Sequence, residues 1–235
     1  MGIFERQSLI IGEEATERLS VKKVALFGVG GVGSYAAEAL ARCGVGNIEL
    51  IDSDRVSESN INRQLCALTS TVGRLKTEVT AERLRDINPQ ICVTERAEFF
   101  LPENADTFDF SSYDFVIDAI DTVSAKIEIA VRCARLGIPM ISSMGTGNKL
   151  DPSALKISDL SKTSGCPLAR VMRRELKKRG IVHLPVVYSE ETPITPLRAE
   201  KTEGGKAVPG SIAFVPSVAG LLAASYAVKM LINKR

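Results

Sequence analysis

Short apolar runs alternate with segments of helical periodicity through the first two thirds of the chain. Continuous runs of aliphatic and β-branched residues are typical of strands that are buried on both faces. Such runs predict strands at residues 22–28, 47–52, 91–95, 115–118 and 139–143. Apolar residues that recur every three or four positions predict helices at residues 34–43, 72–87 and 124–136. This order of elements predicts an α/β fold with a doubly wound, mainly parallel, Rossmann-like sheet.

The last third of the chain has a less regular pattern. Residues 166–179 predict a helix with one apolar face, whereas residues 198–210 are rich in charge and glycine and predict a mobile loop. The most apolar stretch, residues 215–232, is interrupted by serines, a tyrosine and a lysine. We therefore expect a buried helix there, and no membrane span. Because no repeat and no clear domain boundary is visible, we expect one domain with a decorated C-terminal part.

The overall composition is that of an ordinary globular protein. Hydrophobic residues make up 45% of the chain and charged residues 25%, which excludes wholesale disorder. The net charge is only +2, so binding of a nucleic acid would require a local concentration of positive charge. The 5 cysteines form no C-x-x-C pair, which argues against a zinc ribbon, and their odd number argues against a disulfide framework. Since the first residues lack an apolar signal-peptide core, we expect a reduced, soluble, cytoplasmic protein.

A glycine-rich motif follows the first expected strand and opens the first expected helix. Residues 28–34 read Gly-Val-Gly-Gly-Val-Gly-Ser and match the pattern G-x-G-x-x-G. In this pattern Gly28 permits the tight turn, Gly30 lets the backbone approach a phosphate, and Gly33 lets the helix pack closely against the strand. Asp52 ends the second expected strand, where a carboxylate can bind ribose hydroxyls. The motif predicts nucleotide binding and leaves the nucleotide open, with NAD as the starting guess.

Polar residues downstream of this motif change that guess. Asn60, Arg63 and Lys76 follow the second strand, where the carboxyl edge of the sheet gathers side chains. Two cations and an amide suit a triphosphate better than a pyrophosphate that a helix already binds. Asp121 comes just after the strand at 115–118, in the position for holding Mg²⁺ against phosphate oxygens. Each residue alone would be an ordinary solvated charge, but together they favour ATP with Mg²⁺.

Five motifs in this order resemble the adenylation core of the ubiquitin-activating, ThiF-like superfamily. They are Gly28-x-Gly30-Gly31-x-Gly33-Ser34, Leu50-Ile51-Asp52-x-Asp54, Ser59-Asn60-x-x-Arg63-Gln64, Gly73-x-x-Lys76 and Asp118-x-x-Asp121. The resemblance implies that the glycines, Asp52 and Asp54 bind ATP and that Asn60, Arg63 and Lys76 hold its phosphates. It also implies catalytic roles for Arg63, Lys76 and Asp121, with Asp121 as the magnesium ligand. Arg6 falls where such enzymes carry an arginine that reaches the partner subunit's ATP, which implies a homodimer.

Within this superfamily the chain departs from two groups. Activators of sulfur-carrier proteins usually carry two C-x-x-C zinc pairs, which are absent here, and ubiquitin activators add a catalytic cysteine domain, for which there is no room. The chain is instead similar to tRNA threonylcarbamoyladenosine dehydratases. The features are residues 116–121, the pair Asp151-Pro152, residues 157–163 and the C-terminal apolar helix.

The second resemblance implies a domain organisation and a reaction. Residues 1–235 would form a single ThiF-like adenylation domain, with a nucleotide-binding core at 22–144 and a substrate-side part at 145–235. The enzyme would adenylate the threonine carboxylate of threonylcarbamoyladenosine, beside the tRNA anticodon, and then close a ring with release of AMP and pyrophosphate. An accessory sulfur-transfer protein is a possible further partner. Activation of a small sulfur-carrier protein and a non-catalytic nucleotide-binding module remain the alternatives.

A basic segment lies where such a substrate would require positive charge. Between Lys162 and His183 there are seven Lys or Arg residues and one Glu. This segment is either an RNA-binding surface or a solvated helix face. His183 is the only histidine, so a His-based triad or metal site is not expected. Cys166 precedes a proline at an expected helix start, where a cysteine is either structural or reactive.

Overall fold

The computed structural model describes residues 2–201, 205 and 207–233, and across them seven strands form one sheet. The strands lie in the order β3-β2-β1-β4-β5-β7-β6. Their bounds are β1 Lys23–Phe27, β2 Asn47–Ile51, β3 Cys92–Arg96, β4 Phe115–Asp118, β5 Met140–Ser143, β6 Leu155–Asp159 and β7 Pro185–Ser189. All neighbouring pairs are parallel except β6 and β7. The doubly wound, mainly parallel sheet that the sequence predicts is confirmed.

The order of the strands places a ligand-binding position at the middle of the sheet. The chain leaves β1 toward β2 on one side and crosses to β4 on the other. In this register Phe27 lies opposite both Ile51 and Asp118, so three strands end side by side. Open α/β sheets bind ligands at the carboxyl ends of their strands, where the order of the strands reverses. The residues that follow β1, β2 and β4 therefore meet at this edge.

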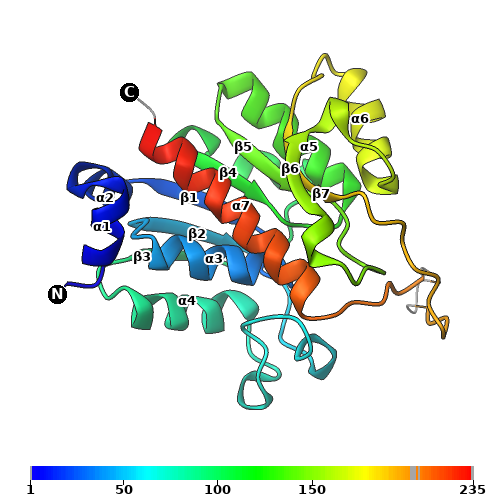
Figure 1. Cartoon of the computed structure of the whole chain (residues 1–235), viewed down its shortest axis with the longest axis horizontal. Helices are drawn as coiled ribbons and strands as arrows, with labels where there is room; N and C mark the ends of the chain where they lie inside the picture. The colour runs from blue at the N-terminus through cyan, green and yellow to red at the C-terminus, as the bar shows by residue number, and fades with distance from the viewer. Residues whose placement is uncertain (1, 202–204, 206, 234–235) are drawn as a thin grey trace.

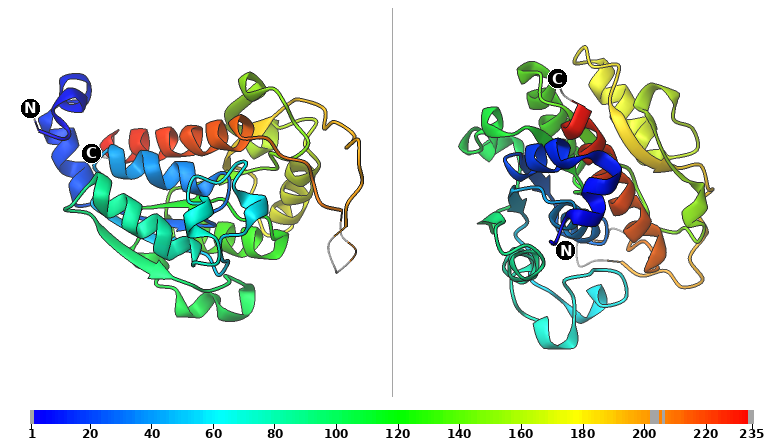
Figure 2. Two further views of the ribbon diagram at one scale, coloured as in Figure 1. Left: turned by 90° about the horizontal axis from the view of Figure 1, so that it is seen from below. Right: turned by 60° about the vertical axis from the view of Figure 1, so that its left-hand side comes forward.

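Helices cover both faces of the sheet (Figures 1 and 2). The first face carries α3 (Gly33–Arg42), α4 (Lys76–Ile87) and α7 (Phe214–Asn233), and α7 packs along α3. The second face carries α5 (Val123–Leu136) and α6 (Pro167–Lys177). Apolar residues fill the space between each helical layer and the sheet, so the sheet is buried on both faces.

The N-terminal helices lie at the opposite end of the molecule from the carboxyl edge of the sheet (Figure 1). They are α1 (Glu5–Ile11) and α2 (Glu13–Ser20), which the hydrophobic pattern did not predict. Gln7 donates a hydrogen bond to the carbonyl oxygen of Cys43, directly after α3, at 3.0 Å. The side chain of Phe4 lies 3.4 Å from the position of a Cβ at Gly44. The start of the chain is thus attached to the end of α3.

The helix predicted at 72–87 begins four residues later than expected, at Lys76. Gly73 has a φ of 88°, a left-handed conformation that a helix excludes. Residues 73–76 instead bind residues 54–56 in a short antiparallel arrangement, in which the backbone N–H of Lys76 donates to the carbonyl of Asp54 at 3.0 Å. This long-range pairing places Lys76 at the first position of α4, beside the carboxyl edge of the sheet.

The C-terminal part of the chain contains both confirmed and unexpected elements. The predicted helices at 166–179 and 215–232 are α6 and α7, whereas β6 and β7 were not predicted. Among the described residues, α7 is the one helix long and apolar enough to cross a membrane, and 44% of its most apolar window is buried inside the protein. Its buried residues pack against α3 and the sheet, as the prediction of a buried helix requires. The loop predicted at 198–210 lies partly outside the described residues.

The close packing of α7 on α3 depends on a glycine. A Cβ added at Gly220 would overlap the carbonyl oxygen of Val32 and lie 3.0 Å from Cβ of Tyr35. We expect Gly220→Ala to lower the free energy of unfolding by about 1–3 kcal/mol, because the two helices must separate to admit a methyl group. Urea denaturation measures this difference. Lys229→Ala, on the exposed side of α7, is the control and should stay within about 0.5 kcal/mol of the wild type. Equal stabilities of the two variants would contradict this account of the packing.

Candidate active site

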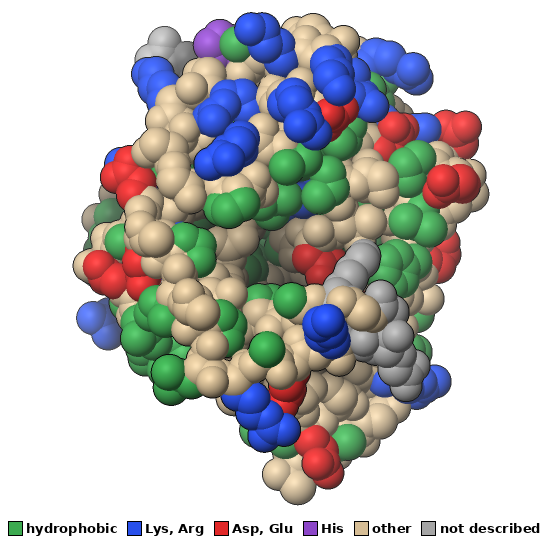
Figure 3. Space-filling view, turned by 90° about the vertical axis from the view of Figure 1, so that its right-hand side faces the viewer, with side chains coloured by type: hydrophobic (Ala, Val, Ile, Leu, Met, Phe, Trp, Pro, Cys, Tyr) green, Lys and Arg blue, Asp and Glu red, His purple; other side chains and the backbone are tan. Residues whose placement is uncertain are grey.

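A cavity of about 430 Å³ opens at the carboxyl edge of the sheet. Figure 3 shows it as a hollow in the molecular surface, with Lys and Arg side chains gathered above it. Nine residues that the sequence singled out line this cavity: Gly28, Gly30, Gly31, Asp52, Asp54, Asn60, Arg63, Lys76 and Asp121. They come from several segments between residues 28 and 121, and the parallel sheet brings them together. Gly33 does not line the cavity and lies beneath the glycine loop.

The glycine loop between β1 and α3 has the geometry that its motif predicts. Gly28 has a φ of 89°, and a Cβ there would lie 2.8 Å from the carbonyl oxygen of Ala119. A Cβ at Gly33 would overlap the carbonyl oxygen of Gly28, so helix and strand pack as closely as expected. At Gly30 the nearest atom to an added Cβ is Nε2 of Gln64, 3.8 Å away, so the backbone is open to the cavity. A phosphate can therefore approach the N-terminus of α3.

Asp52 links the glycine loop to the end of β2 by hydrogen bonds. Its Oδ2 accepts a hydrogen bond from the backbone N–H of Val29 at 2.7 Å, and its Oδ1 accepts one from the N–H of Asp54 at 2.8 Å. Burial raises the pKa of Asp52, while the nearby ammonium of Lys76 opposes this rise. Because each carboxylate oxygen can accept more than one hydrogen bond, Asp52 also retains acceptor sites for ribose hydroxyls.

The two cations of the cavity differ in their surroundings. The buried Nζ of Lys76 lies 2.7 Å from Oδ2 of Asp54, so this lysine already has a counter-ion. The guanidinium of Arg63 donates to the carbonyl of Ser59 at 2.8 Å and to Oδ1 of Asn62 at 3.0 Å. Among the described residues Arg63 forms no ion pair with a carboxylate. A fixed guanidinium that lacks a carboxylate partner is suited to binding a phosphate.

The two amide side chains near these cations differ in their hydrogen bonding. Oδ1 of Asn60 accepts a hydrogen bond from the N–H of Ser57 at 3.1 Å and caps the turn that carries Arg63. Gln64 is 7% exposed and lines the cavity, yet its Oε1 has no hydrogen-bond partner within the described part of the chain. A buried acceptor without a partner is costly unless a ligand supplies a donor. The sequence motif includes Gln64, but sequence reasoning assigned it no role.

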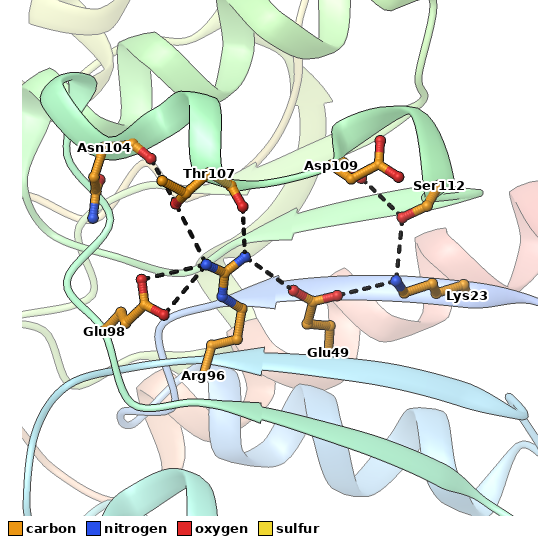
Figure 4. A network of polar contacts seen from close by, with 8 residues as sticks. All are labelled: Lys23, Glu49, Arg96, Glu98, Asn104, Thr107, Asp109 and Ser112. Atoms are coloured by element: carbon orange, nitrogen blue, oxygen red, sulfur yellow. Dashed lines mark hydrogen bonds and ion pairs between the residues drawn. The ribbon is translucent and has the colours of Figure 1, made fainter.

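Another wall of the cavity comes from the segment after β3, which the sequence did not mark. Glu98 and Phe99 line the cavity. A polar network holds this segment on the sheet, as Figure 4 shows. Arg96 lies 3.3 Å from Glu98, 3.7 Å from Glu49, and donates to the carbonyl of Thr107 at 3.1 Å. Because Glu49 is distant from this segment in sequence, only the folded chain reveals the network that supports this wall.

Asp121 fits the role of a magnesium ligand. It is an exposed carboxylate on the loop after β4, it lines the cavity, and it makes no hydrogen bond or ion pair with the described residues. No group of three or more His, Cys, Asp or Glu side chains within those residues is arranged to hold a metal ion. Mg²⁺ usually binds one or two carboxylates together with substrate phosphates and waters, so a single carboxylate beside phosphate-binding cations suits it.

Other residues that the sequence singled out lie outside the cavity. Arg6 is exposed on α1, across the molecule, and does not line this chain's own cavity. His183 is on the surface, with Nδ1 3.2 Å from Oδ2 of Asp159. Cys166 is buried directly before α6. None of these three residues contributes to the site described above.

The basic segment of α6 borders the cavity, because Leu168 of this helix lines it. Six basic side chains are exposed: Lys162, Arg170, Arg174, Lys177, Lys178 and Arg179. We call these six residues the basic surface. Arg173, the seventh basic residue of the segment, is not part of this surface, since its guanidinium donates to the carbonyls of Leu160 and Thr163 at 3.2 and 2.7 Å. Arg173 therefore ties α6 to the preceding turn.

Comparison with known proteins agrees with this geometry. The model of the ThiF family matches residues 4–235. A tRNA threonylcarbamoyladenosine dehydratase from Bacillus subtilis is 45% identical over 98% of this chain and 94% of its own length. The Escherichia coli protein of the same name is 37% identical over 96% and 91%. A crystal structure of the Escherichia coli enzyme in complex with ATP superposes with a TM-score of 0.88, at 37% identity, over 97% of this chain and 93% of that one. The chain therefore belongs to the ThiF family and, within it, to the tRNA threonylcarbamoyladenosine dehydratases.

Proposed function

We propose that this protein uses ATP to adenylate the threonine carboxylate of threonylcarbamoyladenosine in tRNA and then closes a ring on that modification. The observation that carries this proposal is the meeting of the glycine loop, Asp52, Arg63, Lys76 and Asp121 in one cavity. The near full-length similarity to enzymes named for this substrate supports it.

The reaction has two steps. In the first, a carboxylate oxygen attacks the α-phosphorus of ATP, and the bond to pyrophosphate breaks. In the second, a nucleophile within the same modification attacks the activated carbonyl carbon and loses its proton, and the carboxylate oxygen leaves with AMP. The net change in the tRNA is the loss of one water. The first step is needed because a carboxylate is a poor electrophile until its oxygen becomes part of a good leaving group.

The residues of the cavity suit this chemistry. Arg63 and Lys76 stabilise the charge that develops on the phosphates, and the glycine loop presents backbone N–H groups to the same anion. The second nucleophile is on the substrate, so its attack is intramolecular and requires no catalytic cysteine. Among the described residues, those that line the cavity include no cysteine.

We include Mg²⁺, held by Asp121, in this proposal. When bound, the ion would neutralise part of the charge on the phosphates. The exposed position of Asp121 in the cavity that Arg63 and Lys76 also line supports this assignment.

A pyrophosphate-release assay tests the proposed reaction against its alternatives. The protein is incubated with ATP and Mg²⁺ and with tRNA that carries threonylcarbamoyladenosine, the same tRNA without the modification, or a small sulfur-carrier protein. We expect pyrophosphate and AMP only with the modified tRNA, and a nucleoside whose mass is lower by one water. Release with the sulfur-carrier protein alone would favour carrier activation. ATP binding without turnover on any substrate would favour a non-catalytic module.

We also propose that the basic surface binds the tRNA backbone beside the cavity. Within the basic surface, Lys162, Arg170 and Lys177 form no ion pair with the described residues. The other three side chains, Arg174, Lys178 and Arg179, all contact Glu175. These contacts lower the pKa of Glu175 to about 2. The three unpaired side chains are therefore best suited to phosphates, and two of them, Arg170 and Lys177, lie on α6.

We expect the double variant Arg170→Ala/Lys177→Ala to bind tRNA more weakly and with a flatter salt dependence. Each lost phosphate contact should reduce the slope of log affinity against log salt by about 0.7–0.9. A salt titration of tRNA binding measures the slope, and ATP affinity serves as a check of the fold. The matched control is Arg135→Ala/Lys229→Ala, which removes the same charge from exposed positions that do not line the cavity. Identical slopes for the two variants would exclude these side chains from the tRNA site.

We also propose how the chain is divided into functional parts and with what it assembles. Residues 22–144 would form the nucleotide-binding core and residues 145–235 the substrate side, in agreement with the contribution of Leu168, Pro209 and Ser211 to the cavity. A cytoplasmic homodimer, with Arg6 acting at the partner's ATP, is consistent with the exposed Arg6, Leu9 and Ile10 of α1. An accessory sulfur-transfer protein stays a prediction.

A further inference from the structure

A lysine is completely buried beneath the cavity. Lys126 in α5 has an exposed fraction of 0%, and its Nζ lies 2.9 Å from Oδ2 of Asp118, at the end of β4. The same Nζ donates to the carbonyl of Ile120 at 3.1 Å and to the carbonyl of Ser143 at 2.9 Å. The three partners match the three hydrogens of an ammonium group, so all of its donors are used.

The carboxylate of Asp118 is equally well satisfied. It is 0% exposed, and besides Lys126 it accepts hydrogen bonds from the hydroxyl of Ser142 at 2.6 Å and from the N–H of Ile120 at 3.3 Å. A buried ion pair generally stabilises a fold no better than well-packed apolar residues do, because both ions lose their hydration. Because this pair lies among apolar residues, stability alone does not account for its presence.

The two carbonyls that Lys126 binds belong to different loops. Ile120 lies on the loop after β4, directly before Asp121, and Ser143 ends β5 and leads into Gly145. Residues 119–122 and 143–147 line the cavity. One ammonium group thus joins the two loops and sets the distance between them.

We propose that Lys126 is a positioning residue for adenylate formation. Its ammonium group clamps the loops at 119–122 and 143–147 so that Asp121 faces the phosphates. This role rests on the proposed function. Catalytic groups act only when they are held within a fraction of an ångström of the productive geometry, and a shift of about 1 Å can cost about 10²-fold in rate. No shorter or neutral side chain offers three donors from this position in α5.

The test removes the pair as a whole, because loss of the lysine alone would leave Asp118 charged and buried. In the double variant Asp118→Asn/Lys126→Met the core stays neutral and filled. The matched control is Lys149→Met. Lys149 is also buried, with an exposed fraction of 4%, and it donates to the carbonyls of Ser189 and Glu191 at 3.3 and 2.8 Å, neither of which lines the cavity.

Two measurements decide the outcome. Amide hydrogen exchange should be faster by at least about tenfold in residues 119–122 and 143–147 of the double variant, with the glycine loop unchanged and no such effect in the control. In steady-state assays kcat should fall by about 10²-fold while the KM for ATP changes by less than about threefold, and the control should keep its kcat within about twofold.

Three results would overturn the proposal. The first is unchanged hydrogen exchange in both loops of the double variant. The second is faster exchange in these loops together with an unchanged kcat. The third is a loss of kcat in Lys149→Met as large as that in the double variant. Absence of pyrophosphate release by the wild-type protein with modified tRNA is a separate result. It would contradict the proposed function, while hydrogen exchange would still decide whether Lys126 holds the loops.

Discussion

Replacement of Arg63 by alanine is expected to slow adenylate formation by about 10²–10³-fold, which is the usual cost of removing one fixed charge contact to a transition state. The guanidinium is held at the cavity by Ser59 and Asn62 and forms no ion pair with the described residues, so it is free to bind phosphate oxygens. Single-turnover release of pyrophosphate from ATP in the presence of modified tRNA measures the rate of this step.

Arg74→Ala is the matched control for this variant. Arg74 lies in the same region of the chain, but its guanidinium is paired with Glu78 and Glu82 and does not line the cavity. Its loss should change the rate by less than about threefold. Lys76→Ala should resemble Arg63→Ala, with the added repulsion of Asp54, which would lose its counter-ion beside the phosphates. Losses below about tenfold in both Arg63→Ala and Lys76→Ala would mean that the phosphates bind elsewhere.

Asp121→Asn is expected to reduce turnover by at least about 10²-fold and to leave the fold intact. The carboxylate is exposed and forms no hydrogen bond or ion pair with the described residues, so its loss removes no internal polar contact. An amide of the same shape is a far weaker magnesium ligand than a carboxylate. AMP formation over a range of Mg²⁺ concentrations, together with thermal unfolding, separates the loss of the ligand from a loss of stability.

The control for this variant is Asp106→Asn. Asp106 is also an exposed carboxylate, but it is paired with Arg132 and does not line the cavity. Its substitution should leave both turnover and the response to Mg²⁺ unchanged. If Asp121→Asn kept full turnover at every Mg²⁺ concentration, the metal assignment would be wrong and another carboxylate of the cavity would have to serve.

The amino-acid sequence by itself determined the central sheet and most of the candidate site. Strands buried on both faces appear as continuous apolar runs, and right-handed crossovers then leave few ways to order them. Since parallel strands end at one edge, residues just after β1, β2 and β4 had to meet there. This is why Gly30, Asp52 and Asp121 were predicted in one place, and the cavity contains all three.

Only the tertiary structure decided the features that depend on contacts between distant segments. The pairing of residues 73–76 with 54–56 determines where α4 begins and therefore where Lys76 lies. Arg173 is not part of the basic surface because it donates hydrogen bonds to the turn before α6. In the same way Lys126 is, in sequence, an ordinary helix lysine, and its burial against Asp118 appears only when β4, β5 and α5 pack together. Hydrophobic periodicity reports which face of an element is buried. It carries no information about which buried polar groups meet, because that depends on the three-dimensional arrangement of segments far apart in the chain.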